Sequence, residues 1–305
     1  MKWLLTLALV FSQLAAAAPQ QPSQPASGFG GSSYPPAKVS ESEHGAGGKR
    51  FWLFEPAEPE PKSAPLVIFL HGYSATTPAP YRAWLTHIVR RGAIVVYPQY
   101  QKDLLTPPPE FHPNTAASVR QALVVLAEEG HTKPDLSRVI VVGHSAGGVG
   151  AAVYAANAAA EGLPVPRAIM PVHAGQGPEK GWQVIPLGDI SAIPAQTKVA
   201  VVAGAEDRFV GTRSSRRIFE GAKHVKERCF ITLQADDHGS PRLSPGHLAP
   251  LAHDLGGTNA QDWFGYWRLF DELCDATFAG RKFEPSPAMG KWSDGVPVKP
   301  LLIER

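Results

Sequence analysis

The amino-acid sequence predicts a protein of the α/β class, with a mostly parallel central sheet covered by helices on both faces. Apolar runs of strand length alternate with stretches of helical periodicity from residue 50 to residue 278. Continuous apolar runs are typical of parallel strands that are buried on both sides. The length of 305 residues, with 44% hydrophobic and 18% charged residues, suits one large domain. Functional residues are therefore expected at the carboxyl ends of the strands.

The first half of the pattern consists of strands that alternate with helices. The run PLVIFL has the length of a buried strand, and Trp84, Ile88 and Val89 then recur at helical spacing. Gly92 can end that helix before the run AIVVY, and Gly130 can end the next helix before the run VIVV. The expected elements are strand 50–54, strand 65–70, helix 81–91, strand 93–97, helix 115–129 and strand 139–142.

The second half continues this alternation to an aromatic-rich last helix. A helix of small residues follows the run VIVV directly, and apolar runs of strand length return three more times. The expected elements are helix 146–160, strands near 168–172 and 198–203, helix 213–225, strand 228–233 and helix 262–278. The segment between His173 and Lys198 leaves room for only a small cap, which predicts an open cleft. His173 and Trp182 are expected to pack or to be solvated rather than to line that cleft.

The two ends of the chain differ from the expected catalytic domain, residues 49–282. Lys2, an apolar run over 3–14 and small residues over 15–18 have the order of a secretory signal peptide, with cleavage expected after Ala17. A membrane anchor is the alternative, but the run is shorter than the roughly 20 residues that cross a bilayer. Residues 19–48 are rich in Pro, Gly and Ser, which predicts an unstructured linker. Residues 283–305 are expected to be a C-terminal tail.

The charge and the two cysteines limit the possible partners and the compartment. The net charge is +2, and no cluster of basic residues interleaves with aromatic ones, so a nucleic-acid partner is not expected. A secreted chain with only Cys229 and Cys274 is expected to form one disulfide, because the last helix should pack on the strand that Cys229 opens. The alternative is two buried free thiols. No metal-site spacing is present, and the oligomeric state is left open.

The strongest chemical motif is Gly143-His144-Ser145-Ala146-Gly147, a match to G-x-S-x-G. The strand VIVV runs into it and a helix leaves it, which places Ser145 on a sharp strand-to-helix turn. Glycines on both sides suit such a crowded turn, whereas an ordinary helix N-cap would not need them. Ser145 is therefore the predicted nucleophile, and a serine nucleophile needs a histidine and a carboxylate.

The acid and the base are expected after Ser145 in the order acid, then histidine. Asp207 follows the buried strand KVAVVAG and is the predicted acid, with the adjacent Glu206 as the competitor. His238 ends the run FITLQADDH and is the predicted base, ahead of His247 and of His253, which lie farther from a strand end. The neighbours of His238, Asp236 and Asp237, are expected to be loop carboxylates.

Two backbone N–H groups are expected to form an oxyanion hole. One belongs to Ala146, the residue after the nucleophile. The other belongs to Tyr73, because His71-Gly72-Tyr73 follows the early strand PLVIFL at the place where this second donor is needed. An ordinary turn after a strand is the alternative for this loop.

With these motifs in their order, the region from residue 50 to residue 280 resembles the α/β-hydrolase superfamily. The His-Gly-Tyr-Ser loop and the GHSAGG turn are similar to the dienelactone-hydrolase-like and secreted polyesterase branches. The resemblance implies the α/β-hydrolase fold and a cofactor-independent serine esterase that works through an acyl-enzyme. Secreted polyesterases commonly carry a disulfide near the C-terminal end, to which Cys229 and Cys274 could correspond.

The expected function is hydrolysis of a carboxylic ester, either a small molecule or a polymer, by a secreted or periplasmic enzyme. Two alternatives use the same fold. A peptidase or amidase would need a larger cap or a second domain, which the chain does not show, and a non-catalytic binding protein would not need Ser145, Asp207 and His238 together. A dehalogenase would need a carboxylate in place of Ser145.

Overall fold

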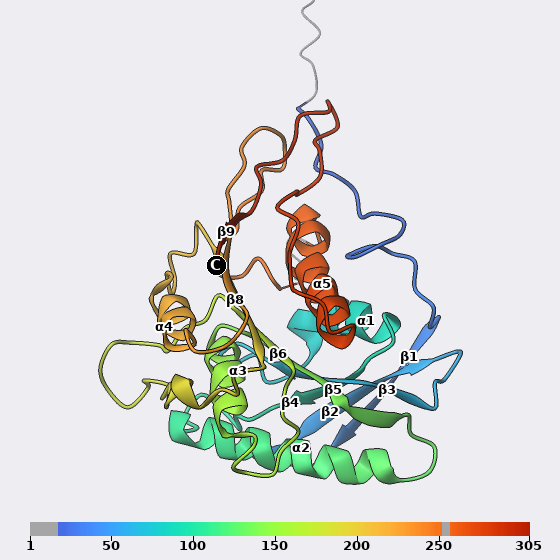
Figure 1. Cartoon of the computed structure of the whole chain (residues 1–305), viewed down its shortest axis with the longest axis vertical. Coiled ribbons are helices and arrows are strands. Elements are labelled where there is room, and N and C mark those ends of the chain that lie inside the picture. Colours follow the sequence, from blue (N-terminus) through green and yellow to red (C-terminus); the bar gives the residue numbers. More distant parts are fainter. Residues whose placement is uncertain (1–17, 252–256) are drawn as a thin grey trace, which may run out of the picture.

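The computed structural model describes residues 18–251 and 257–305 (Figure 1). The predicted signal peptide, residues 1–18, lies outside these ranges except for Ala18, and His253 also lies outside them. Within these ranges, no helix combines the length and the apolar character that a membrane crossing requires.

A nine-stranded sheet runs through the described part of the chain in the order β1-β2-β4-β3-β5-β6-β7-β8-β9. The strands from β4 to β8 are parallel, whereas β1, β2 and β9 pair antiparallel with their neighbours. The strands are β1 Lys38–His44, β2 Phe51–Ala57, β3 Ser63–Leu70, β4 Ile94–Pro98, β5 Lys133–His144, β6 Ala168–Val172, β7 Lys198–Gly204, β8 Arg228–Leu233 and β9 Leu302–Glu304.

Helices cover both faces of the sheet, as Figure 1 shows. On one face, α2 (Phe111–Ala127), α3 (Ala146–Asn157) and α4 (Arg213–Gly221) pack on one apolar layer. On the other face, α1 (Arg82–Arg90) and α5 (Trp267–Phe278) pack on a second layer. The apolar runs of β3 to β8 are buried on both sides, which is why they lack alternation. The predicted α/β class and the α/β-hydrolase fold are confirmed.

The N-terminal segment is not a linker where the structure describes it, so the prediction for residues 19–48 is wrong. Residues 38–44 form the edge strand β1, which pairs with the full length of β2. Ahead of it, the Gly30 N–H donates to Asp271 Oδ2 at 2.8 Å, and the Trp263 indole N–H donates to the carbonyl of Pro22 at 3.1 Å. The segment packs against the C-terminal helical region that contains Trp263 and Asp271, and it does not form a hydrophobic core of its own.

The C-terminal tail is also part of the domain. Strand β9 pairs antiparallel with β8, and the side chains of Trp292, Val298 and Leu301 are buried. Asp236 Oδ2 accepts hydrogen bonds from the Trp292 indole N–H at 3.1 Å and from the Lys299 N–H at 2.8 Å. The boundary expected at residue 282 is therefore not a structural boundary.

The predicted disulfide is not formed, because Cys229 and Cys274 are both free thiols. The helix that carries Cys274, α5, packs on α1 and β6 rather than on β8, which carries Cys229. The expectation that the last helix, α5, packs on β8 is therefore wrong. Burial raises the pKa of Cys229 to about 12 and raises that of Cys274 as well, so the thiol form is favoured at both positions.

Candidate active site

Ser145 lies on a strained turn between β5 and α3. Its backbone has φ +57° and ψ −119°, and its N–H donates to the carbonyl of Val172 at 2.9 Å. The turn is so tight that a Cβ on Gly143 would lie 2.0 Å from the Gly147 carbonyl oxygen, and one on Gly147 would lie 2.1 Å from that of Leu70. Only glycine fits at these two positions, so the strand-to-helix turn expected from the sequence is present.

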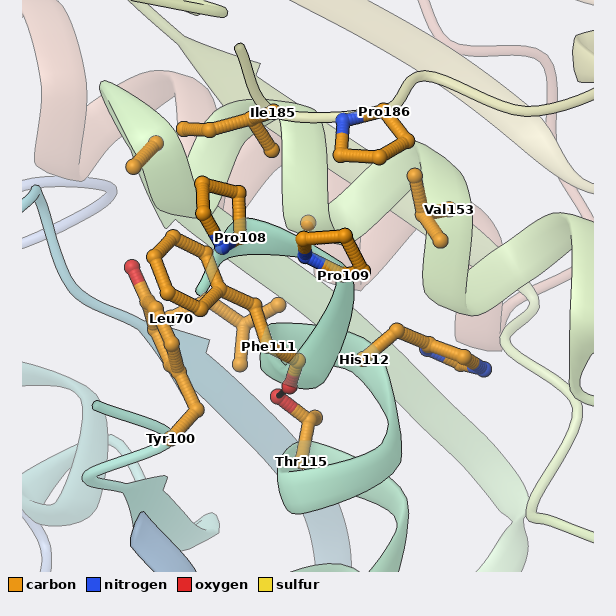
Figure 2. Close-up of a pocket in the computed structure, with 12 residues that line it drawn as sticks. Leu70, Tyr100, Pro108, Pro109, Phe111, His112, Thr115, Val153, Ile185 and Pro186 are labelled. Carbon is orange, nitrogen blue, oxygen red and sulfur yellow. Dashed lines mark hydrogen bonds between the residues drawn. The ribbon is translucent and has the colours of Figure 1, made fainter. Parts of the chain in front are cut away.

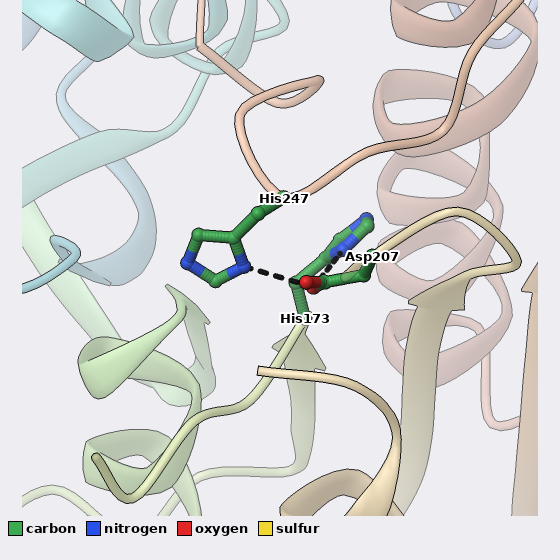
Figure 3. Close-up of side chains that lie close together, drawn as sticks. All are labelled: His173, Asp207 and His247. Atoms are coloured by element: carbon green, nitrogen blue, oxygen red, sulfur yellow. Dashed lines mark hydrogen bonds and ion pairs between the residues drawn. The ribbon is translucent and has the colours of Figure 1, made fainter. Parts of the chain in front are cut away.

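The Ser145 hydroxyl meets a histidine and a carboxylate. His247 Nε2 lies 2.9 Å from Ser145 Oγ, and His247 Nδ1 lies 2.8 Å from Asp207 Oδ2. Asp207 follows β7, and His247 is on the loop after β8 (Figure 3). All three residues are buried. This is the arrangement in which an imidazole can take the serine proton while a carboxylate fixes its tautomer.

The expectation that His238 would lie against Ser145 is wrong. Its Nε2 lies 2.7 Å from Asp294 Oδ2, at the surface. Strand β8 is three strands away from β5 in the sheet, or about 14 Å at the usual strand spacing, so a residue close to the end of β8 is too far away. A bridge between Asp236 and Leu243 turns the loop back, and His247 then reaches the site.

Asp207 and Glu206 have separate environments although they are adjacent. Glu206 accepts hydrogen bonds from Arg242 at 2.9 Å and from Ser244 at 2.5 Å, away from Ser145. Asp207 Oδ1 accepts hydrogen bonds from two backbone N–H groups at 3.0 and 3.1 Å, and Oδ2 accepts hydrogen bonds from the imidazoles of His173 and His247. Burial alone would raise the pKa of Asp207, but the hydrogen bonds from His173 and His247 outweigh it and hold the pKa far below its usual value. The carboxylate is ionised at neutral pH.

A second network of hydrogen bonds connects the nucleophile turn, the base and the His-Gly loop. The His144 ring N–H (Nε2) donates to the carbonyl of His247 at 2.8 Å, and the Tyr81 hydroxyl donates to His144 Nδ1 at 2.7 Å. The Gly72 N–H in turn donates to the Tyr81 oxygen at 2.8 Å. Burial lowers the pKa of His144 well below its usual value, so the ring is neutral, as this donor pattern requires.

The two N–H groups expected in the oxyanion hole flank the nucleophile. Ala146 is the first residue of α3, so its N–H has no partner within the helix. Gly72 lies so close that a Cβ on it would be 3.3 Å from Ser145 Cβ, which brings the adjacent Tyr73 to the nucleophile. Within residues 18–251 and 257–305, neither of these N–H groups has a hydrogen-bond acceptor.

A cleft with a volume of about 730 Å³ opens above Ser145. Phe209 is 83% exposed and Leu248 is 59% exposed, and the Phe209 ring stacks on His247 with a centroid distance of 5.0 Å. Exposed side chains of this size at the entrance favour an apolar ligand. The cleft is lined by Gly72, Tyr73, Ser74, Ala75, Tyr81, His144, Ser145, Phe209, Ser244, Gly246, His247, Leu248, Ala249 and Leu251.

A second, smaller cavity of about 70 Å³ borders Ala146, the residue after the nucleophile. Figure 2 shows Pro108, Phe111, Val153 and Ile185 around it, on the side of the sheet that α2 and α3 cover. Its lining is almost entirely apolar, with His112 and Thr115 as the polar exceptions, so it suits a short apolar group.

Donor atoms of His173, Asp207 and His247 lie within 4.8 Å of one another, a spacing that could hold a metal ion. The two imidazoles are already hydrogen-bonded to the carboxylate, however, and these bonds account for the cluster. The triad geometry is therefore a sufficient explanation of why these residues lie together.

The fold and the serine turn define a protein with the α/β-hydrolase fold. A family model described as chlorophyllase matches residues 35–197, just over half of the chain, and the protein belongs to this family of α/β-hydrolase-type esterases. The predicted superfamily is thereby confirmed. The match includes Ser145 and the His-Gly loop and ends before Asp207. No curated protein matches the sequence.

Proposed function

We propose that the protein hydrolyses carboxylic esters with Ser145 as nucleophile, His247 as general base and Asp207 as the acid of the triad. The observation that carries this proposal is the hydrogen-bond series from Ser145 Oγ through His247 to Asp207, with distances of 2.9 and 2.8 Å. Membership of an esterase family supports the ester as the reacting group. The strained turn supports Ser145 as the attacking residue.

In the proposed acylation step, Ser145 Oγ attacks the ester carbonyl carbon while His247 Nε2 takes the hydroxyl proton. The carbonyl oxygen becomes negative, and the N–H groups of Ala146 and Tyr73 stabilise it. The imidazolium formed on His247 is stabilised by the ionised Asp207. The C–O bond then breaks, His247 gives its proton to the leaving alcohol, and the acyl group stays on Ser145.

Deacylation repeats these steps with water. His247 takes a proton from a water molecule, whose oxygen attacks the acyl carbon, and the same two N–H groups stabilise the second intermediate. Collapse of this intermediate returns the proton to Ser145 Oγ and releases the carboxylic acid.

The two cavities support an ester with a short acyl group and a larger apolar alcohol. The alcohol must leave beside His247, which protonates it, and this is the side of the large cleft with Phe209 and Leu248. In this proposal the acyl group enters the smaller cavity, which adjoins Ala146 and has room for only a short chain. Chlorophyll, after which the family is named, has a large apolar alcohol but also a large ring system on its acyl side, so it tests whether the acyl group must be short.

The experiment is a matrix of esters in which the acyl chain and the alcohol vary independently, with chlorophyll and an anilide added. We expect the wild type to prefer short acyl chains and to tolerate large alcohols, and we expect Ser145→Ala to lose at least ~10³-fold in kcat. Cleavage of the anilide with no ester turnover would favour an amidase instead. Substrate binding without turnover would favour a non-catalytic binding protein.

We also propose that the protein is exported, because residues 1–18 have the composition of a signal peptide. The test is the N-terminal sequence of the protein made in a secreting host. A mature chain that begins at Ala18 supports export, and an intact N-terminus on protein from inside the cell contradicts it.

A further inference from the structure

The carboxylate of Asp207 accepts a hydrogen bond from a second histidine, which the proposed mechanism does not use. His173 lies directly after β6, and its Nδ1 is 2.8 Å from Asp207 Oδ2, the same oxygen that His247 contacts (Figure 3). The side chains of His173 and Asp207 are 0% and 1% exposed. A buried polar ring in direct contact with a reacting group requires an explanation of its own.

We propose that His173 is a positioning residue for the triad: its ring N–H orients the Asp207 carboxylate toward His247, and Tyr266 fixes the tautomer in which His173 donates. This inference rests on the proposed esterase mechanism and assigns a role in it to two residues that touch no substrate.

The hydrogen bonds of the His173 ring define which nitrogen carries the proton. The Tyr266 hydroxyl lies 2.8 Å from His173 Nε2 and can donate to it, which leaves the proton on Nδ1, facing Asp207. Burial lowers the pKa of His173, although its hydrogen bond to Asp207 raises it, and the ring stays neutral at neutral pH. Ser145, His247, Asp207, His173 and Tyr266 thus form one continuous series.

The surrounding backbone is shaped to hold this ring. His173 has φ +47°, a left-handed conformation that costs free energy in a residue with a Cβ. Gly204, at the end of β7, makes room for it, because a Cβ there would lie 2.5 Å from His173 Cε1. Tyr266 ends a π-helical turn, Asp262–Tyr266, before α5, and such turns are frequent at functional sites. These three features come from different elements and meet at the same ring.

The effect on catalysis follows from the shared oxygen. An N–H group that donates to a carboxylate withdraws negative charge that would otherwise stabilise the imidazolium of His247. Loss of the His173 N–H therefore has two consequences. The carboxylate is less well oriented, which lowers kcat, and it attracts a proton on His247 more strongly, which moves the acid limb of the activity profile to higher pH.

Other titratable groups face this cluster and bear on its pH dependence. The His144 ring lies 4.9 Å from that of His247 and 6.1 Å from that of His173, and burial keeps it neutral. Burial raises the pKa of Tyr266 and raises that of the nearby Asp262 to about 7. Asp262 titrates in every variant, so the midpoint of the acid limb is compared as the difference between each variant and the wild type.

The experiment compares His173→Leu, His173→Asn and Tyr266→Phe, with kcat, KM, the pH profile of kcat/KM and Tm for each. We expect His173→Leu to lower kcat about tenfold with KM within twofold, and to raise the midpoint of the acid limb by about 0.5 pH unit. Asparagine tolerates the left-handed backbone and places its amide N–H near the position of Nδ1, so it should restore most of both quantities. Tyr266→Phe should give a smaller shift in the same direction.

His87 provides a matched control. It is a buried ring between an aspartate and a tyrosine as well, with Asp271 Oδ2 at 3.0 Å and Tyr34 OH at 2.9 Å, but it lies on α1 and outside the cleft. His87→Leu should lower Tm and leave kcat and the pH profile unchanged. The same variant set includes Ser145→Ala to test the mechanism itself.

Three outcomes would overturn the proposal. A folded His173→Leu variant with wild-type kcat and pH midpoint contradicts it, as does a His173→Asn variant no better than leucine. If His173→Leu does not fold, a wild-type pH midpoint in Tyr266→Phe contradicts it. Equal activity of Ser145→Ala and the wild type would instead remove the proposed function, so the two failures are distinguishable.

Discussion

Ser145 combines a strained backbone conformation with a hydroxyl that is hydrogen-bonded to His247 Nε2. Residues rarely adopt φ +57° and ψ −119° unless the surroundings enforce it, and here Gly143 and Gly147 allow the close packing that does so. The strain directs Oγ to His247 Nε2 and leaves the Ala146 N–H free to act on a substrate oxygen. The conformation of one residue thus provides both the nucleophile and half of the oxyanion hole.

The identity of the base gives a prediction at this scale. We expect His247→Ala to lower kcat/KM at least ~10³-fold, because no other described group contacts Ser145 Oγ to take its proton. His238→Ala is the control, since its ring hydrogen-bonds to Asp294 at the surface and packs beside Trp292, and it should keep activity within twofold. Steady-state kinetics of both variants on one ester decide whether His247 or His238 is the base. Loss of activity in His238→Ala alone would contradict the structural assignment.

The residues of the candidate site show what the sequence could and could not predict. Ser145 and Asp207 were predictable because each directly follows a buried strand, and strand ends are visible in the apolar pattern. His247 follows its strand by a loop that first turns away, and the path of that loop depends on the bridge between Asp236 and Leu243. His173 also directly follows a predicted strand, but that position alone did not indicate its role, which depends on contacts with Asp207 and Tyr266 that are remote in sequence.

At the element scale, the core strands and helices were predictable and the terminal segments were not. Strands β3 to β8 and helices α1 to α5 have continuous apolar runs or helical periodicity, which report burial directly. The terminal segments are held by separate anchors such as Trp292 and Leu301, which show no period. A segment that buries a few side chains on another element looks like a linker in composition.

Asp236 is the main polar anchor of the C-terminal tail. It accepts the Trp292 indole N–H, the Lys299 N–H and the His238 N–H, and its residue is 3% exposed. We expect Asp236→Ala to lower the free energy of unfolding by about 2–4 kcal/mol, because one buried and two partly buried donors lose their acceptor. The adjacent, exposed Asp237, which pairs with Arg242, is the matched control. Thermal unfolding of Asp236→Ala and Asp237→Ala measures the two losses of stability. An equal, small loss in the two variants would contradict the role of Asp236 as an anchor.

At the scale of the whole molecule, several buried histidines make stability depend on pH. Burial lowers the pKa of His71 to about 4 and lowers those of His144 and His173, so these rings are neutral in the folded state and charged in the unfolded state below pH ~6.5. The unfolded state therefore binds more protons, and stability falls as the pH falls. Asp262, with its pKa raised to about 7, acts in the opposite direction over the same range.

Since three histidines act in one direction and one aspartate acts in the other, we expect a net uptake of protons on unfolding near pH 5.5. We expect Tm to decrease by roughly a few °C as the pH falls from 6.5 to 5. Calorimetry in buffers of different ionisation enthalpy measures the proton uptake directly. A Tm that is constant over this range would mean that the histidines are not buried neutral.

Covalent labelling with a fluorophosphonate tests whether Ser145 is a nucleophile that His247 activates. This reagent phosphonylates an activated serine, and mass spectrometry of the intact protein and of its peptides locates the adduct. We expect a single adduct on Ser145, absent in Ser145→Ala, formed much more slowly in His247→Ala and at the wild-type rate in His238→Ala. Labelling at another residue, or labelling of His247→Ala at the wild-type rate, would contradict it.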